Sequence, residues 1–137
     1  MIRLRHLVAL AAILLIPLTG CSNSPAVTAG IGEPFTLGVG QSAQIAAEGM
    51  AVKFNEVIDD SRCPQGVTCI WAGQASSRVT ITYQGKDYPM VLTLLGSTDQ
   101  TKESFAQYTL IYGLSPYPVQ GQRISPKDYR LNLTVTK

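Results

Sequence analysis

The sequence predicts an all-β protein, either a single-domain antiparallel β-sandwich of immunoglobulin-like architecture or a small barrel, with about seven short strands. Three observations support this prediction. From Glu33 onward, apolar and polar residues alternate with a period of two, helical periodicity is weak, and turn-forming residues separate the apolar runs. Short strands divided by turns are typical of sandwiches and small barrels.

Each expected strand is a short run bounded by residues that favour turns. In the fourth run, Val79, Ile81 and Tyr83 alternate with polar residues, which predicts a half-buried strand. Gln84-Gly85-Lys86-Asp87 then predicts a tight hairpin turn, whereas the polar run 96–103 predicts a loop. The expected strands, all within a domain at 33–137, are 35–39, 43–46, 50–58, 76–83, 88–95, 107–112 and 128–135.

The N-terminal segment has the pattern of a bacterial secretory signal. Arg3 and Arg5 precede an apolar run at 7–16, which is too short for a membrane span of roughly 20 residues. The residues that follow, Leu18-Thr19-Gly20-Cys21, resemble the lipobox of bacterial lipoproteins.

The lipobox resemblance implies that residues 1–20 are removed and that Cys21 carries the lipid, with palmitate among its acyl chains. Two or more acyl chains give stable attachment to the cell membrane. The anchored protein would face the exported side, in the outer membrane of a Gram-negative cell because Ser22 and not Asp follows the cysteine. Residues 21–32, which are small, polar and interrupted by Pro and Gly, predict a lipidated flexible tether.

Composition argues against several classes of function. The 11 basic residues include Arg3 and Arg5, so nine remain against 9 acidic residues after the expected cleavage, and no basic run stands out. We therefore expect no nucleic-acid partner. The only histidine, His6, lies in the removed segment, so the mature chain has no imidazole for proton transfer or metal binding. We expect no cofactor and no metal.

Two cysteines remain besides Cys21, and in an oxidising exported compartment Cys63 and Cys69 should form a disulfide. A redox-active pair usually has two intervening residues and this pair has five, while a zinc site needs four ligands. A stapled turn between two strands is therefore the favoured interpretation, with redox and metal binding as weaker alternatives.

The residues around these cysteines carry a second resemblance. The run Asp60-Ser61-Arg62-Cys63-Pro64, followed by Val67 and Cys69-Ile70-Trp71-Ala72-Gly73, is similar to a motif in small exported bacterial proteins of no established function. The resemblance extends from Met50 to the C-terminus through Pro116, Pro118, Ile124 and 128–129. It implies a genuine domain and brings no activity with it.

The stapled turn offers the first candidate binding surface. We expect Arg62 and Gln65 to form an exposed polar tip, preceded by Asp59 and Asp60 in a solvated loop. Trp71 is interpreted first as a core residue, because tryptophan packs on the disulfide of immunoglobulin domains, and second as a ligand platform. In those domains, however, the disulfide joins distant strands.

The second candidate surface is the loop at 112–119. Its Tyr112 and Tyr117, set among prolines, predict a rigid loop that displays aromatic rings to a partner. The alternative is a crossover loop whose tyrosine packs into the core.

These features predict a lipid-anchored cell-envelope protein that binds and does not catalyse. It would dock an envelope protein or a cell-wall component through the turn at 63–69 and the loop at 112–119. One alternative is a small inhibitor that presents the Cys63–Cys69 loop to an exported hydrolase. Another is a carboxylate-based hydrolase, which is disfavoured because the adjacent Asp59 and Asp60 should point to opposite faces of an extended segment.

Overall fold

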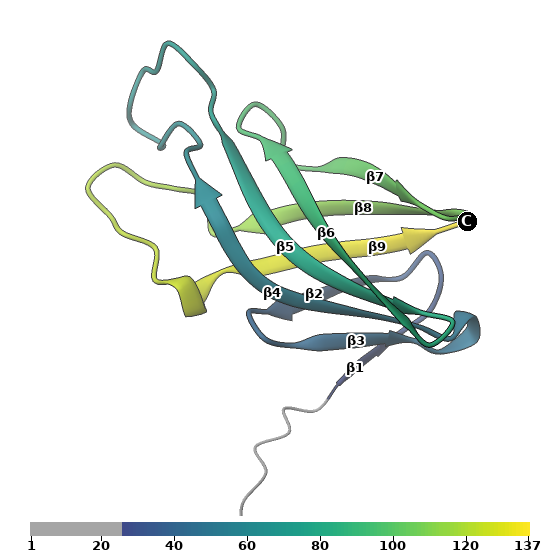
Figure 1. Cartoon of the computed structure of the whole chain (residues 1–137). Coiled ribbons are helices and arrows are strands. Elements are labelled where there is room, and N and C mark those ends of the chain that lie inside the picture. Colours follow the sequence, from purple (N-terminus) through teal and green to yellow (C-terminus); the bar gives the residue numbers. More distant parts are fainter. Residues whose placement is uncertain (1–25) are drawn as a thin grey trace, which may run out of the picture.

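The protein folds as two β-sheets packed face to face, as seen in a computed structural model that describes residues 26–137 (Figure 1). The β-sandwich prediction is confirmed, and the barrel alternative is wrong because the strands form two separate sheets. The expected signal segment 1–20 and the expected lipid site Cys21 lie outside the described residues.

The first sheet has five strands in the order β1-β3-β4-β5-β6 and the second has four in the order β2-β9-β8-β7. All neighbouring strands are antiparallel except β1 and β3. The strands are β1 (Val27–Ala29), β2 (Pro34–Gly38), β3 (Ser42–Ile45), β4 (Met50–Asp60), β5 (Gln74–Tyr83), β6 (Lys86–Leu95), β7 (Thr101–Phe105), β8 (Tyr108–Ser115) and β9 (Arg130–Thr136). Single turns of 3-10 helix occur at Ala46–Glu48 and Pro126–Asp128.

The described chain contains nine strands, two more than the sequence predicted. Strand β1 lies inside the range 21–32 that we assigned to the tether, and its three residues are too few to show an alternating pattern. Strand β7 lies partly inside the expected loop 96–103. It forms an edge of its sheet and most of its side chains face solvent, so four of its five residues are polar and give no strand signal.

The predicted hairpin turn between β5 and β6 is confirmed and is shorter than expected, because β6 already begins at Lys86. Its two loop residues, Gln84 and Gly85, both have positive φ angles, of 51° and 74°. A two-residue loop of this kind matches the right-handed twist of the strands it joins.

Inward-facing side chains of both sheets form a single apolar core. Alternation places these residues on the inner face of every long strand, as the sequence predicted for 76–83 and 128–135. The most deeply buried members are Leu37, Ala43, Ile45, Val52, Phe54, Val79, Ile81, Leu110, Leu131 and Val135.

Two long connections extend beyond the sheets at the same end of the sandwich (Figure 1). One is the segment 61–73 between β4 and β5, called the stapled loop below because it contains both cysteines. The other is the segment 116–123 after β8, called the proline loop below. The candidate site is built around them.

Candidate functional site

The stapled loop begins as a continuation of the β4–β5 ladder. The amide of Ser61 donates to the carbonyl of Gln74 over 2.8 Å, and the amide of Cys63 donates to that of Ala72 over 2.9 Å. Gly73 permits this narrow base, because its φ is +71° and a Cβ there would collide with the Ser61 carbonyl. The predicted disulfide is confirmed and closes the loop, with the two Cα atoms 5.9 Å apart.

The stapled loop and the proline loop are joined by backbone hydrogen bonds. The amide of Gln65 donates to the carbonyl of Pro118 over 2.9 Å, and the amide of Gln120 donates back to the carbonyl of Gln65 over 3.1 Å. Gln65 and Val119 thereby form a parallel bridge. The two candidate surfaces that the sequence suggested separately are one structural unit, with the side chain of Gln65 exposed as predicted.

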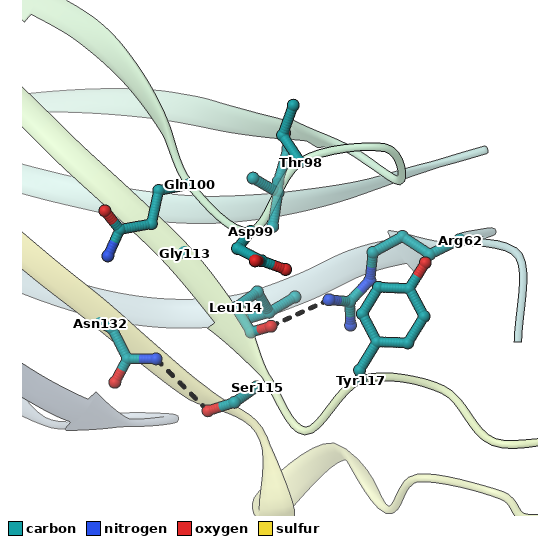
Figure 2. A pocket seen from close by; sticks show the side chains of 10 residues that line it. Arg62, Thr98, Asp99, Gln100, Gly113, Leu114, Ser115, Tyr117 and Asn132 are labelled. Atoms are coloured by element: carbon teal, nitrogen blue, oxygen red, sulfur yellow. Dashed lines mark hydrogen bonds between the residues drawn. The ribbon is translucent and has the colours of Figure 1, made fainter. Parts of the chain in front are cut away.

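Arg62 is buried below this unit, so the prediction that it forms an exposed tip is wrong. Its guanidinium binds both carboxylate oxygens of Asp60, at 2.8 and 2.7 Å. It also donates to the carbonyls of Leu114 at 2.8 Å and Pro116 at 3.0 Å, and lies 4.9 Å from the ring centre of Tyr117 (Figure 2). An arginine can be 98 % buried here because the planar guanidinium fits a carboxylate and several carbonyls at once.

Asp60 is the partner that makes this burial possible. It ends β4 and only 6 % of its side chain is exposed, so it is not part of the solvated loop that the sequence suggested. Burial raises the pKa of its carboxyl. The hydrogen bonds and charge of Arg62, together with the hydroxyl of Tyr129 3.0 Å away, lower this pKa by more than burial raises it. The net pKa is low, which suits an ion-pair partner and does not suit the general acid of a hydrolase.

The tip of the stapled loop is apolar and exposed. Ile70 is 93 % exposed and Trp71 is 82 % exposed, so the interpretation of Trp71 as a core residue is wrong. The physical reason is the staple, which closes a loop that extends past the end of both sheets, where no inner face is left to cover the ring (Figure 1). The immunoglobulin-type packing of a tryptophan on a disulfide is absent at this position.

The two tyrosines of the second candidate surface have different positions. Tyr112 is buried between the sheets and its hydroxyl donates to the carbonyl of Thr93 over 2.9 Å, so it is not a surface residue. Burial, followed by the charge of Glu103, raises its pKa. Tyr117 is half-buried, and its hydroxyl donates to the carbonyl of Gly96 over 3.0 Å. Only Tyr117 therefore borders a possible binding site.

A cavity of about 610 Å³ lies beside Arg62 and Tyr117 (Figure 2). The connection between β6 and β7 crosses close over β8 at this point. Gly113 permits the crossing, because a Cβ at this position would lie 2.5 Å from the carbonyl oxygen of Asp99. The remaining walls come from the ends of β6, β8 and β9. The lining residues are Arg62, Leu94, Thr98, Asp99, Gln100, Gly113, Leu114, Ser115, Tyr117 and Asn132.

The pocket presents uncharged polar groups and one carboxylate. Asp99 and Gln100 are exposed at its mouth, and Asp99 takes part in none of the three ion pairs found within residues 26–137. Deeper in, the amide of Asn132 donates to the hydroxyl of Ser115 over 3.4 Å. The charge of Arg62 is balanced by Asp60, so it does not make the pocket cationic.

The sequence did not suggest this pocket, since Thr98–Gln100 appeared only as loop residues and Asn132 as an outward strand residue. Gly113 permits the close crossing from within β8, but the sequence prediction ended this strand at 112 and assigned Gly113 to the loop 112–119.

No group of three or more His, Cys, Asp or Glu side chains suited to a metal occurs within residues 26–137. Over the same range no helix is both long and apolar enough to cross a membrane. Comparison of the chain with protein-family models, with curated proteins and with solved structures finds no match.

Proposed function

We propose that this chain is a lipid-anchored binding module of the bacterial cell envelope, and that its pocket takes a hydroxyl-rich, uncharged component of the cell wall. The observation that carries the proposal is the pocket of about 610 Å³ framed by two loops that backbone hydrogen bonds join. The expected lipid on Cys21 would hold this pocket close to the membrane surface.

The rigidity of the frame supports a role in binding. Arg62 ties the end of β4 to Leu114 on β8 and to Pro116 in the proline loop. The disulfide closes the stapled loop, and the Gln65 bridge holds this loop against the same proline loop. A wall that is already ordered loses little conformational entropy when a ligand binds, so preorganisation favours this site.

The lining chemistry supports the class of ligand. The Asp99 carboxylate accepts hydrogen bonds from hydroxyl groups, and the Gln100 and Asn132 amides both donate and accept them. Sugars and other polyols offer many hydroxyl groups that act in both senses. An anionic ligand would face the uncompensated charge of Asp99, so the pocket disfavours anions.

This proposal is tested with N-acetylglucosamine oligosaccharides as the neutral probe, titrated by calorimetry into the purified protein. Asp99→Ala should weaken binding about tenfold or more, because a hydrogen bond to a charged group contributes about 1.5–3 kcal/mol. Asp87→Ala, in a surface carboxylate at the β5–β6 hairpin, is the matched control and should leave binding unchanged. Failure of the wild-type protein to bind, or equal binding by Asp99→Ala, would contradict the proposal.

The anchor is tested separately. Cys21→Ser should abolish lipid attachment, seen as the loss of acyl mass, and release the domain from the membrane fraction. A Cys21→Ser variant that stays acylated and membrane-bound would show that the lipobox assignment is wrong.

A second candidate function is inhibition of an exported hydrolase, and the exposed Ile70 and Trp71 favour it. A rigid loop with two apolar residues at its tip suits insertion into the cleft of an enzyme. In this case, crosslinking from position 71 in intact cells should capture a hydrolase, and the purified protein should lower the activity of that hydrolase. Capture of cell-wall material alone would favour the pocket proposal.

A further inference from the structure

The tip of the stapled loop combines high exposure with a complete lack of charge. Ile70 and Trp71 are 93 % and 82 % exposed, and Val67 beside them is 41 % exposed. No Asp, Glu, Lys or Arg occurs from Cys63 to Gly73. Insertion of this tip into an apolar medium would therefore require no charged group to lose its water.

The direction of β1 brings the expected anchor toward the same end of the sandwich. Strand β1 is parallel to β3, and β3 is antiparallel to β4, so the chain enters β1 from the end where β4 leads into the stapled loop. Through this pairing Val27 is level with Val52, which is roughly 26 Å along β4 from Asp60 at about 3.3 Å per residue. Cys21, six residues before Val27, can cover about 20 Å of that span.

We propose that Ile70 and Trp71 insert into the boundary between headgroups and acyl chains of the membrane that holds the lipid anchor. The proposal rests on the anchoring part of the proposed function and is independent of the pocket. The indole ring of tryptophan suits this boundary, because its body is apolar and its N–H can still reach water or a headgroup. The anchor keeps the tip near the lipid surface, so even a small apolar contact acts at high effective concentration.

Insertion would give the domain a defined orientation. The anchor and the tip would be two separate contacts with one bilayer, which prevents free rotation about a single tether. The stapled loop would then face the lipid, and the β5–β6 hairpin at the other end of the sandwich would point away from it (Figure 1).

The test uses the fluorescence of Trp71, which is the only tryptophan in the chain. The lipidated protein is reconstituted in vesicles of phosphatidylcholine and phosphatidylglycerol, after its acyl mass has been confirmed. Trp71 emission should shift to shorter wavelength relative to the unlipidated Cys21→Ser protein in buffer. Phospholipids brominated near the glycerol end of the acyl chain should quench it, and aqueous iodide should lose most of its effect. Emission that stays water-like and fully open to iodide would overturn the proposal.

Two variants keep the probe and sharpen the result. Ile70→Ser removes half of the apolar tip and should reduce quenching by brominated lipid while restoring quenching by iodide. Val91→Ser, in a residue 53 % exposed on β6, is the matched control and should change neither. Equal effects of the two variants, or a blue shift that appears only after another exported protein is added, would overturn membrane insertion.

The two proposals fail in different ways. Absence of an acyl group on Cys21 would contradict the proposed anchoring. Vesicle binding by the unlipidated protein would then test the tip proposal by itself, and a lack of binding would overturn it. Asp99→Ala should weaken sugar binding about tenfold or more and leave the Trp71 spectrum in vesicles unchanged.

Discussion

The base and the tip of the stapled loop lie within a dozen residues of one another and reverse the usual distribution of polarity. At the base, the charged pair Asp60 and Arg62 is buried. At the tip, the apolar pair Ile70 and Trp71 is exposed. The difference shows that burial along this segment follows the availability of partners and not the hydropathy of the residue.

Each member of the buried pair has a full set of partners, which explains why it can leave water. Arg62 contacts a carboxylate, two carbonyls and the ring of Tyr117, and Asp60 also accepts from Tyr129. The apolar tip has no comparable surroundings within residues 26–137. The base therefore stabilises the fold, whereas the tip is the part for which we propose an external contact.

The largest expected effect comes from breaking the base. Arg62→Ala should lower the free energy of unfolding by roughly 3–5 kcal/mol, because it leaves the Asp60 carboxylate buried without a counter-charge. Urea unfolding followed by circular dichroism measures this loss. Arg62→Lys should recover little of it, since an ammonium group cannot reproduce the planar set of contacts. A loss below about 1 kcal/mol would show that water reaches the pair and screens its charges.

A smaller effect is expected from opening the staple between base and tip. Replacing both Cys63 and Cys69 by Ser should cost about 2 kcal/mol, the chain-entropy value for a closed loop of seven residues. Reduction of the wild-type protein should give the same loss in urea unfolding. An unchanged midpoint would mean that the Gln65 bridge to the proline loop alone maintains the loop.

The pH dependence of stability provides a further test of the base. The pKa of Asp60 is lower in the folded protein than its ordinary value of about 3.9, so the folded state favours the ionised form. This contribution is complete above the unfolded pKa and is lost as the pH falls through the folded value. The stability gap between wild type and Asp60→Asn should therefore narrow below about pH 4, as measured by thermal unfolding. A constant gap would contradict the assigned shift.

The smallest effect on stability is expected at the tip. Ile70→Ser and Trp71→Ala should each change the free energy of unfolding by less than about 0.5 kcal/mol, because neither side chain has a buried environment to lose. Urea unfolding, run beside Arg62→Ala, makes the comparison direct. If either tip variant lowered the free energy of unfolding by several kcal/mol, base and tip would not differ in their contribution to stability, and Trp71 would have a structural role.

The sequence by itself determined the parts of this protein that depend on local pattern. Alternation of apolar and polar residues predicted the long strands β4, β5, β6 and β9 nearly in full, because each has one face on the core. The hairpin at Gln84–Gly85 was also predictable, since a glycine that permits positive φ marks the turn. Two spare cysteines in an expected exported chain were enough to predict the disulfide.

The tertiary structure alone decided which polar residues are buried and which apolar residues are exposed. Arg62 lies inside because the carbonyls of Leu114 and Pro116, more than 50 residues away, meet it there. Trp71 lies outside because the loop that carries it extends beyond both sheets. The pocket likewise requires the crossing of the 96–100 connection over Gly113. Contacts between residues distant in the chain set each of these environments, and no local pattern in a single sequence records them.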